Sequence, residues 1–457
     1  MSTLMDTYIE SNHDRFLDEL REFLAIPSIS TLPQHRPDIE RASEFVAQKL
    51  RDAGMEKVER IGTGGHPLVY GEWLGAPGKP TVLCYGHYDV QPPDPLEEWT
   101  TPPFEPSVRN QNIYARGAAD DKGQMYIHLK AVESLLTTRG SLPVNVKFLI
   151  EGEEEVGGAA VDQFVRKHPE KLRADAVLVS DTEMFAPGLP TLCIGLRGLI
   201  YTELVATGAA HDLHSGLFGG AAPNPLTGLI RIISQLVSPE HRVLVPGFYD
   251  DVVKPSPGEK SSWTQLPFDE KKFLEEEVGS PGLIGEAGFG VLERLWARPT
   301  LEVHGIVGGF IGEGGKTVIP AKASAKVSMR LVPRQDPEKI VNAFRNEVNR
   351  LAPPALRVQI KILSSGEPVL MDAAHPYVQA AAQALTATFH RPTVFTRSGG
   401  SIPIVSRFRD ALGAPVVLMG FGLPDDRLHA PNEKFHLPNF FDGIRAVGLF
   451  WENLGNQ

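Results

Sequence analysis

Cysteine is scarce in this sequence, and its setting favours neither disulfide bonding nor covalent catalysis. The 457 residues include two cysteines, Cys84 and Cys193, each in a short apolar run, 81–85 and 192–196. A thiol in such a run usually acts as a small buried apolar group. We therefore expect both cysteines to be free and buried, which is typical of a protein from a reducing compartment.

Basic charge and long apolar runs are also in short supply. The 45 Lys and Arg residues are outnumbered by 56 Asp and Glu, giving a net charge of −11, whereas nucleic-acid-binding proteins usually present a basic surface. No apolar run approaches the roughly 20 residues of a membrane helix, and the first residues lack the basic start and apolar stretch of a secretion signal. The sequence therefore predicts a cytoplasmic protein that binds neither nucleic acid nor membrane.

The length predicts two domains, because single cores rarely grow beyond about 250–300 residues. Apolar residues at helical spacing predict helices within 9–24 and 39–50. Further along, short continuous apolar runs alternate with helical stretches such as 123–136, a pattern typical of a mostly parallel sheet flanked by helices. These runs are 81–85, 144–150, 176–179 and 415–419.

The middle third follows another pattern and predicts an α+β insertion. Strands are expected at 198–207 and 321–331, and helices at 225–237 and 337–351. A stretch rich in proline and charge, 245–277, predicts loops with at least one short helix. The predicted fold is thus an α/β main domain, formed by 1–197 and 372–457, with an inserted domain at 198–371.

Histidines and carboxylates follow the predicted strands at the points where those strands end. Because the carboxyl ends of parallel strands meet at one edge of a sheet, we expect these side chains to converge there. Histidine and carboxylate ligands suit borderline divalent ions such as zinc, and acidic groups can bridge two of them. The residues concerned are His87, Asp89, Asp120, Asp121, Glu153, Glu154, Glu155, Asp181 and His429.

Each of these features also has a simple structural explanation. A lone histidine at a strand end is more often structural than a ligand, and the run of three glutamates, taken alone, would usually be a solvated charged segment. Asp120 and Asp121 could cap the helix that starts near Gly123 and complement its dipole. All of these explanations would have to hold together at one edge of one sheet, so the metal-site hypothesis is preferred.

At this point the sequence resembles a known family. The segments 86–91 (GHYDVQ), 116–123 (RGAADDKG), 151–157 (EGEEEVG) and 179–181 (VSD) resemble the metal motifs of the dinuclear zinc aminoacylase and carboxypeptidase family. The cytosolic non-specific and carnosine dipeptidase branch is indicated by 212–216 (DLHSG), 316–320 (KTVIP), 330–333 (RLVP), 399–403 (GGSIP) and 429–434 (HAPNEK). The resemblance extends over almost the whole chain.

The resemblance implies two divalent cations per subunit, zinc with manganese or cobalt as alternatives. His87 and Asp181 would hold one metal, Glu155 and His429 the other, and Asp120 would bridge them. Asp89 would orient His87 by accepting its second ring N–H. A water activated by the paired metals would then attack the amide bond of a dipeptide or very short peptide, with Glu154 as general base.

Three consecutive glutamates permit a shift of one residue in these assignments. In the family, the base and the ligand directly precede one variable residue and a glycine. Val156 and Gly157 therefore select Glu154 and Glu155, and Glu153 has no catalytic role.

The resemblance also implies a lid and dimerisation role for the inserted domain. It implies substrate contacts at Arg330, Thr317, Gly400, Ser401 and His214. Arg330 would hold a C-terminal carboxylate, and His214 would contact the reacting carbonyl from a partner subunit of a homodimer. Ser398 departs from the pattern, because many dipeptidases of this branch have an acidic residue before the two glycines. That departure keeps open a deacylase or carboxypeptidase that acts on N-acyl amino acids.

Other functional classes fit less well. Residues 312–317 (GEGGKT) resemble the end of a phosphate-binding loop, but Phe310 stands where its first glycine should be, and Pro320 leaves no room for the helix that follows such a loop. No Gly-x-Ser-x-Gly motif is present to indicate a serine hydrolase. A non-catalytic relative would be expected to lose its general base first, whereas Glu154 is retained.

Overall fold

The computed structural model describes residues 3–456 and divides the chain into two compact units. The first unit comprises 1–194, 371–396 and 404–457, and the second comprises 195–370 and 397–403. Segment 397–403 was expected in the main domain, but it clusters with the second unit. The reason is local: the backbone N–H of Arg197 donates to the carbonyl of Gly400 (3.1 Å).

The first unit is built on one mixed sheet in the strand order β1-β2-β6-β3-β7-β17-β8. The four central strands β6, β3, β7 and β17 run parallel, and the strands on either side of them are antiparallel. In chain order the strands are β1 (Lys57–Ile61), β2 (Leu68–Trp73), β3 (Thr81–His87), β6 (Asn145–Glu151), β7 (Ala176–Val179), β8 (Thr191–Leu196) and β17 (Val416–Leu418). Strand β16 (Val394–Ser398) also pairs with β8.

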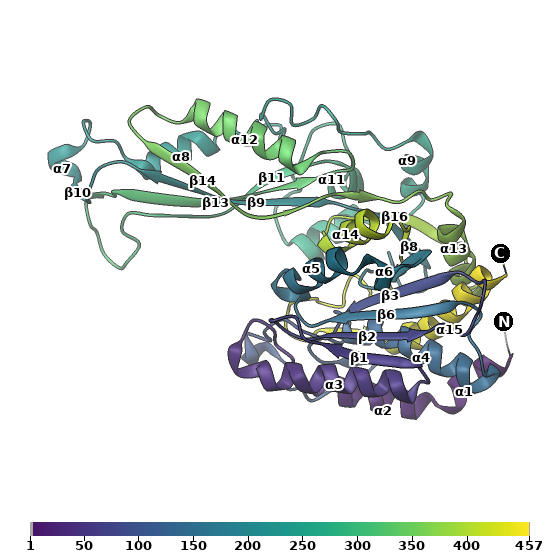
Figure 1. Ribbon diagram of the computed structural model, residues 1–457. Helices are drawn as coiled ribbons and strands as arrows, with labels where there is room; N and C mark the ends of the chain where they lie inside the picture. Colours follow the sequence, from purple (N-terminus) through teal and green to yellow (C-terminus); the bar gives the residue numbers. More distant parts are fainter. Residues whose placement is uncertain (1–2, 457) are drawn as a thin grey trace. The chain divides into compact units, whose positions relative to one another are not determined.

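Helices cover both faces of this sheet, and alternate residues of β3 show why its sequence is apolar from Val82 to Tyr85. Val82 and Cys84 belong to the core formed with α4, whereas the ring of Tyr85 lies 5.4 Å from that of Phe408 on α14. A strand buried on both faces needs apolar residues at every position. Figure 1 shows the helices around the strands. They are α1 (Thr3–Ser11), α2 (His13–Leu24), α3 (Arg36–Asp52), α4 (Lys122–Arg139), α5 (Ala159–Lys167), α6 (Pro169–Leu172), α13 (Pro376–Phe389), α14 (Pro403–Leu412) and α15 (Leu437–Gly455).

Helix α4 lies at the centre of this unit, and every residue of it from Lys122 to Leu135 is buried. It packs against α15 and β3, so it has no solvent-facing stripe for most of its length. Gly140, with φ of 72°, adopts the left-handed conformation that ends the helix. A small three-stranded sheet completes the unit: β4 (Ser107–Arg109), β5 (Asn112–Tyr114) and β18 (Lys434–His436).

The second unit contains a four-stranded antiparallel sheet in the order β11-β13-β9-β14. Figure 1 shows helices α8 and α12 on one side of it, and both contribute to a separate apolar core. The strands are β9 (Gly198–Thr207), β10 (Leu213–His214), β11 (Thr300–Gly308), β12 (Val318–Ile319), β13 (Lys322–Leu331), β14 (Arg357–Gly366) and β15 (Val369–Leu370). The helices are α7 (Ser215–Phe218), α8 (Pro225–Ile233), α9 (Pro257–Thr264), α10 (Glu270–Lys272), α11 (Val291–Ala297) and α12 (Pro337–Leu351).

Most predicted elements are present with small changes at their ends. Helix α8 ends at Ile233 rather than at Val237, because the next residues form turns and Val237 pairs with Val243. The apolar spacing persists beyond the helix because Leu236 still packs in the core. Segment 245–277 holds α9, α10 and most of a π-helix (Phe273–Val278) among loops, which agrees with the expectation of loops and at least one short helix. Both cysteines are free and buried, which confirms the sequence prediction.

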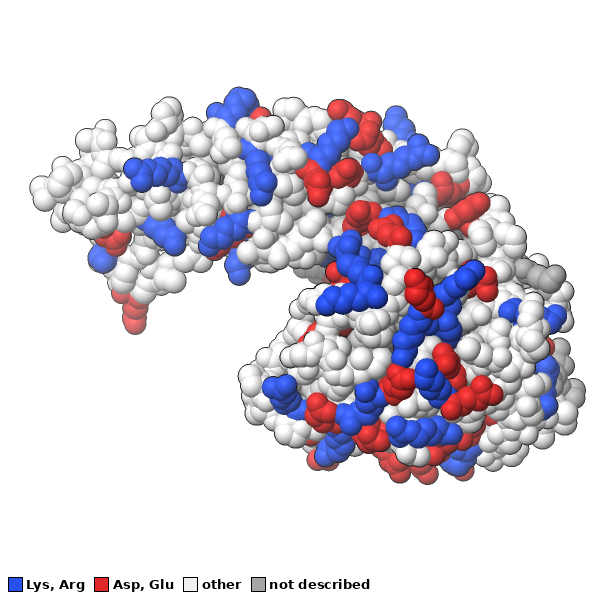
Figure 2. Space-filling view, viewed as in Figure 1, with Lys and Arg blue, Asp and Glu red and all other residues white. Residues whose placement is uncertain are grey.

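Surface charges of both signs are interspersed on the face shown in Figure 2. Many charged side chains of the protein pair with each other, as Arg60 does with Glu44 (3.1 Å) and Lys361 with Glu203 (2.9 Å). Exposed pairs of this kind contribute little to stability. No helix among residues 3–456 is both long and apolar enough to span a membrane.

Candidate dinuclear metal centre

The carboxyl ends of the parallel strands bring the predicted metal ligands together in the first unit. His87 is the last residue of β3, Asp181 is the second residue after β7, and Glu155 lies in a short 3₁₀ turn after β6. Asp120 precedes α4, and His429 lies in the loop between β17 and β18. Since β6, β3, β7 and β17 are neighbours in the sheet, residues more than 300 positions apart meet at one edge.

These five side chains form two groups that share Asp120. One group is His87, Asp120 and Asp181, the other is Asp120, Glu155 and His429, and within each group the potential ligand atoms all lie within 4.8 Å of one another. Nε2 of His87 lies 3.1 Å from Oδ1 of Asp120, and Nε2 of His429 lies 2.8 Å from its Oδ2. The two oxygens of one carboxylate therefore face two different histidines, as a bridging ligand would require.

The donor set fits divalent cations. Nε2 of His87 is buried and has no hydrogen-bond partner among the described residues, although Oδ1 of Asp120 is within 3.1 Å. Burial and then the charge of Asp120 raise the pKa of Asp181 well above its ordinary value. Burial and then the charge of Asp181 likewise raise the pKa of Asp121 well above its ordinary value. Buried carboxylates that repel one another are what a bound cation would neutralise.

The same excess of negative charge raises the pKa values of the two histidines. Hydrogen bonds to Asp120 and then to Glu155 raise the pKa of His429 to about 10. Burial opposes the charged form of His87, but its contacts with Asp120 and Asp89 outweigh burial and raise its pKa. In the absence of metal, a proton on the His429 imidazole balances part of the carboxylate charge.

Asp89 is placed somewhat differently from the sequence expectation. Nδ1 of His87 lies 3.1 Å from the main-chain carbonyl of Asp89 and 3.4 Å from its carboxylate. The carboxylate itself accepts the backbone N–H groups of Glu154 and Glu155, at 3.3 and 3.2 Å. Asp89 therefore orients the His87 ring mainly through its backbone, and its side chain fixes the turn that carries the two glutamates.

The three consecutive glutamates have distinct surroundings. Oε1 of Glu153 accepts the backbone N–H of His66 (2.7 Å), so this residue is engaged away from both ligand groups. Glu155 belongs to one ligand group. Glu154 belongs to neither ligand group. Burial raises the pKa of Glu154 to about 8; the nearby His87 opposes this rise, and the charge of Glu155 adds to it.

Two supporting residues were not identified from the sequence. Nε2 of Gln91 donates to Oε2 of Glu155 (2.7 Å) and so orients that ligand. Glu433 is fully buried and accepts the backbone N–H groups of Gly117, Ala119 and Asp120, at 2.9, 2.9 and 3.2 Å. Both residues lie inside motifs already singled out, 86–91 and 429–434, where polar residues beside metal ligands were the available signal.

Asp121 occupies the N-cap position of α4, but its side chain makes no capping hydrogen bond. Its Oδ2 instead accepts the backbone N–H of His87 (3.2 Å). The simple capping explanation for this pair of aspartates is therefore wrong.

The predicted substrate-contact residues all belong to the second unit. His214 is the last residue of β10, and Thr317 directly precedes β12, the strand that pairs with β10. The backbone N–H of Ser215 donates to the carbonyl of Thr317 (3.1 Å), so the two residues lie close together. Arg330 on β13 donates from Nη1 to Oγ of Ser401 (2.8 Å). Gly400 donates its backbone N–H to Oγ of Ser398 (3.0 Å).

Histidine and carboxylate groups at the carboxyl ends of parallel strands, arranged around one shared aspartate, define the site of a metal-dependent hydrolase. A family model described as peptidase family M20/M25/M40 matches residues 83–453. The chain belongs to this peptidase family.

Several relatives match over nearly the full length. The chain is 34% identical to the Cys-Gly metallodipeptidase dug1 of Schizosaccharomyces pombe, over 98% of this chain and 97% of the relative. Among solved structures, the dipeptidase Dug1p of Saccharomyces cerevisiae superposes with a TM-score of 0.85 at 29% identity, covering 100% and 98% of the two chains. An M20 family metallo-carboxypeptidase from Sulfolobus solfataricus superposes with a TM-score of 0.87 at 32% identity, covering 97% of this chain and 99% of that one.

Proposed function

We propose that this protein is a dinuclear metal-dependent dipeptidase that hydrolyses the amide bond of dipeptides or very short peptides. The observation that carries the proposal is the pair of ligand groups joined by Asp120. The similarity to named metallodipeptidases over nearly the whole chain supports it.

Two divalent cations would be held as the ligand groups suggest: His87 and Asp181 on one, Glu155 and His429 on the other, and Asp120 between them. When bound, the cations supply positive charge that lowers the pKa of a water molecule and polarises the substrate carbonyl. Zinc, manganese and cobalt all accept this mixture of nitrogen and oxygen ligands.

Glu154 is the proposed general base. It accepts a proton from the attacking water and later delivers that proton to the leaving amine. Its position in the turn is fixed by the hydrogen bond from its backbone N–H to Asp89. The rise of its pKa with burial favours a carboxyl group that can both take and return a proton near neutral pH.

The substrate preference is proposed to be for a free dipeptide, with an N-acyl amino acid as the alternative. Two observations favour the alternative: the similarity to a metallo-carboxypeptidase and the serine at position 398. A panel of free dipeptides, β-alanyl dipeptides, longer peptides and N-acyl amino acids, assayed on metal-reconstituted protein, separates the two. Highest kcat/KM on a free dipeptide supports the proposal, and highest kcat/KM on an N-acyl amino acid replaces it with the deacylase.

We also propose that the second unit serves as lid and dimerisation domain and that His214 acts on the active site of a partner subunit. Nδ1 of His214 accepts the backbone N–H of Gly216 (2.9 Å), so in the neutral ring the proton is on Nε2. An exposed ring with Nε2–H is able to donate to a carbonyl oxygen that gains negative charge during the reaction.

A mixed dimer tests this assignment. Glu154→Gln and His214→Ala should each be inactive as homodimers. After subunit exchange, one site in each mixed dimer would combine an intact base with an intact histidine, so part of the activity should return. If exchange is verified and no activity returns, His214 does not act across the dimer.

The cytoplasm is the proposed location, because two free buried thiols suit a reducing compartment.

A further inference from the structure

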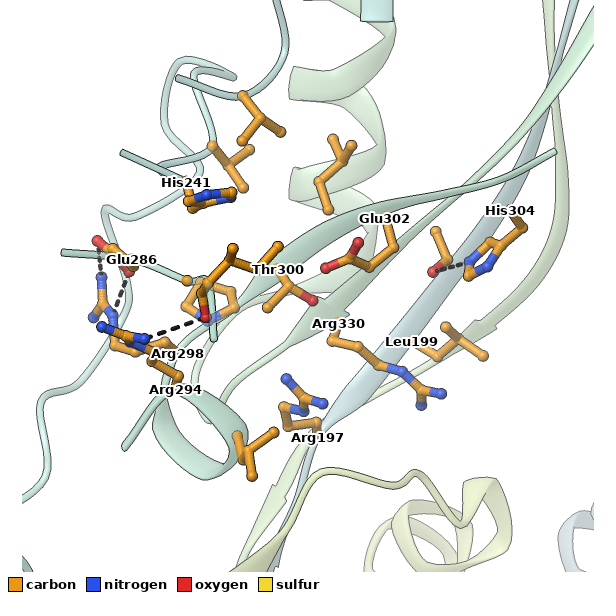
Figure 3. A pocket seen from close by; sticks show the side chains of 18 of the residues that line it. Arg197, Leu199, His241, Glu286, Arg294, Arg298, Thr300, Glu302, His304 and Arg330 are labelled. Carbon is orange, nitrogen blue, oxygen red and sulfur yellow. Dashed lines mark hydrogen bonds and ion pairs between the residues drawn. The ribbon is translucent and has the colours of Figure 1, made fainter. Parts of the chain in front are cut away.

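The second unit contains a pocket of about 640 Å³ against strands β9, β11 and β13 (Figure 3). Arg330 lines this pocket and is already one of the proposed substrate contacts, so the pocket gives no evidence of a separate ligand site. The proposed metal centre lies in the first unit. There, segment 26–30, which follows helix α2, is hydrogen-bonded to residues around the metal ligands.

Ser28 binds the peptide groups on both sides of Asp89. Its Oγ donates to the carbonyl of Tyr88 (2.6 Å), and its own carbonyl accepts the backbone N–H of Val90 (2.9 Å). Ile29 also forms an isolated parallel β-bridge with Val90. Ser28 and residues 88–90 are fully buried, so these hydrogen bonds are shielded from water.

The peptide group that Ser28 holds is the one that faces His87. Nδ1 of His87 lies 3.1 Å from the carbonyl of Asp89. That carbonyl and the N–H of Val90 belong to one planar peptide group, so the bond to Ser28 fixes the plane that presents the carbonyl to the imidazole. The Asp89 carboxylate accepts the backbone N–H groups of the 154–155 turn. A rotation of the Asp89 backbone would therefore disturb that turn as well.

The end of helix α2 and the residues after it are also tied to the loop that carries Asp120. Lys122 is fully buried and donates from Nζ to the carbonyls of Phe23 (3.1 Å) and Ile26 (2.7 Å). Asp120 lies two residues before Lys122, and its Oδ1 is 3.1 Å from Nε2 of His87. The same short stretch of chain thus contacts both loops whose ligand atoms have to meet.

A third link runs through His66 to the turn that carries the glutamates. Nε2 of His66 lies 3.3 Å from the carbonyl of Ser30, and its backbone N–H donates to Oε1 of Glu153 (2.7 Å). Segment 26–30 is therefore connected to three loops of the proposed metal centre, although it supplies none of the proposed ligands.

We infer that Ser28 is a positioning residue of the metal centre. Its hydroxyl and its carbonyl hold the backbone on either side of Asp89, which orients His87. Lys122 holds the Asp120 loop against the same segment, so the separation of the two ligands is set before any ion binds. Without this support, part of the binding free energy would be spent on ordering the loops. The inference rests on the proposed metal centre.

Titration of metal-free protein with Co²⁺, followed by visible absorption, measures both the affinity and the ligand geometry. Ser28→Ala removes the hydroxyl that donates to Tyr88. Ser43→Ala is the matched control, because Ser43 is a fully buried serine on helix α3 of the same unit. Its hydroxyl donates to the carbonyl of Glu40 (2.8 Å) and accepts Nε of Arg60 (3.0 Å), so its hydrogen bonds hold α3 rather than a ligand loop.

Ser28→Ala should lower the affinity for Co²⁺ roughly tenfold or more, because partners that orient metal ligands usually contribute about 10- to 100-fold. The absorption bands of bound Co²⁺ should shift, since they depend on ligand geometry. Ser43→Ala should keep the wild-type affinity and bands. Unfolding in urea with chelator should show some loss of stability in both variants, because each loses a buried hydrogen bond.

Lys122→Met keeps an apolar side chain of similar length and removes both donors to the end of α2. It should also weaken Co²⁺ binding. The double variant with Ser28→Ala should lose less affinity than the product of the two single losses, because both residues act through one segment.

Wild-type Co²⁺ affinity and absorption bands in Ser28→Ala would overturn the inference. Equal losses of affinity in Ser28→Ala and Ser43→Ala would do so too, because Ser28 would then contribute to stability alone. A double variant whose loss equals the product of the single losses would refute the shared action of Ser28 and Lys122. Failure of the proposed metal centre is recognised separately, because the wild-type protein would then bind no Co²⁺.

Discussion

Replacing Glu433 by alanine should destabilise the first unit much more than removing an exposed glutamate. Glu433 is fully buried, and so is its partner Arg116, whose Nη1 lies 2.8 Å from Oε2 of Glu433. Removing one member of a buried ion pair leaves the other charge without compensation, which costs about 3–5 kcal/mol. The three backbone N–H groups of the 117–120 loop would lose their acceptor as well.

The matched control is Glu44→Ala. Glu44 pairs with Arg51 and Arg60 at 3.2 and 3.1 Å, but its side chain is 52% exposed, so its loss should cost less than about 1 kcal/mol. Unfolding in urea is followed for both variants, with chelator and with metal, at pH 8. Burial raises the pKa of Glu433 to about 7 while Arg116 opposes that rise, so the carboxylate is charged under these conditions.

The loss of unfolding free energy in Glu433→Gln should lie between the losses in Glu433→Ala and Glu44→Ala, because glutamine keeps one acceptor oxygen but carries no charge. Metal affinity should fall in parallel, because the loop that Glu433 holds carries Asp120. If Glu433→Ala cost no more than Glu44→Ala in chelator, the ion pair would not stabilise the fold and the reasoning from burial would be refuted.

Two further predictions concern the glutamates and the protons of the site. Glu154→Gln should keep both metals and lose roughly 10²–10⁴-fold in rate, while Glu155→Gln should lose one metal by elemental analysis; a metal-retaining inactive Glu153→Gln would shift the assignment by one residue. Metal binding near pH 7 should release at least one proton per chain and strengthen as pH rises, because the pKa of His429 is about 10 in the metal-free protein and a ligating imidazole must be neutral. Calorimetry in buffers of different ionisation enthalpy measures that release, and a binding enthalpy independent of both buffer and pH would contradict it.

The sheet and the places of the metal ligands could be predicted because both follow from local sequence. Residues 82–85 and 176–179 are apolar at every position because both faces of β3 and β7 are buried. Polar residues directly after such strands must lie at the sheet edge. His87 and Asp181 were found in this way, whereas His429, in a loop eleven residues beyond β17, depended more on the resemblance.

Contacts between segments distant in the chain could not be predicted from the sequence. Glu433 accepts hydrogen bonds from residues more than 300 positions away, and no periodicity marks such a partner. The same holds for segment 397–403, which joins the second unit through Arg197 and Arg330. The preference of His87 for the backbone of Asp89 over its carboxylate depends on ångström-scale loop geometry that residue types do not specify.

Metal titration of the chelator-treated protein tests the central claim most directly. Metal content by elemental analysis and dipeptide hydrolysis are measured on the same samples as Zn²⁺ or Mn²⁺ is added. The account predicts negligible hydrolysis without metal, and activity that rises to a plateau at two ions per chain. Full hydrolysis in protein shown to be free of metal would contradict it.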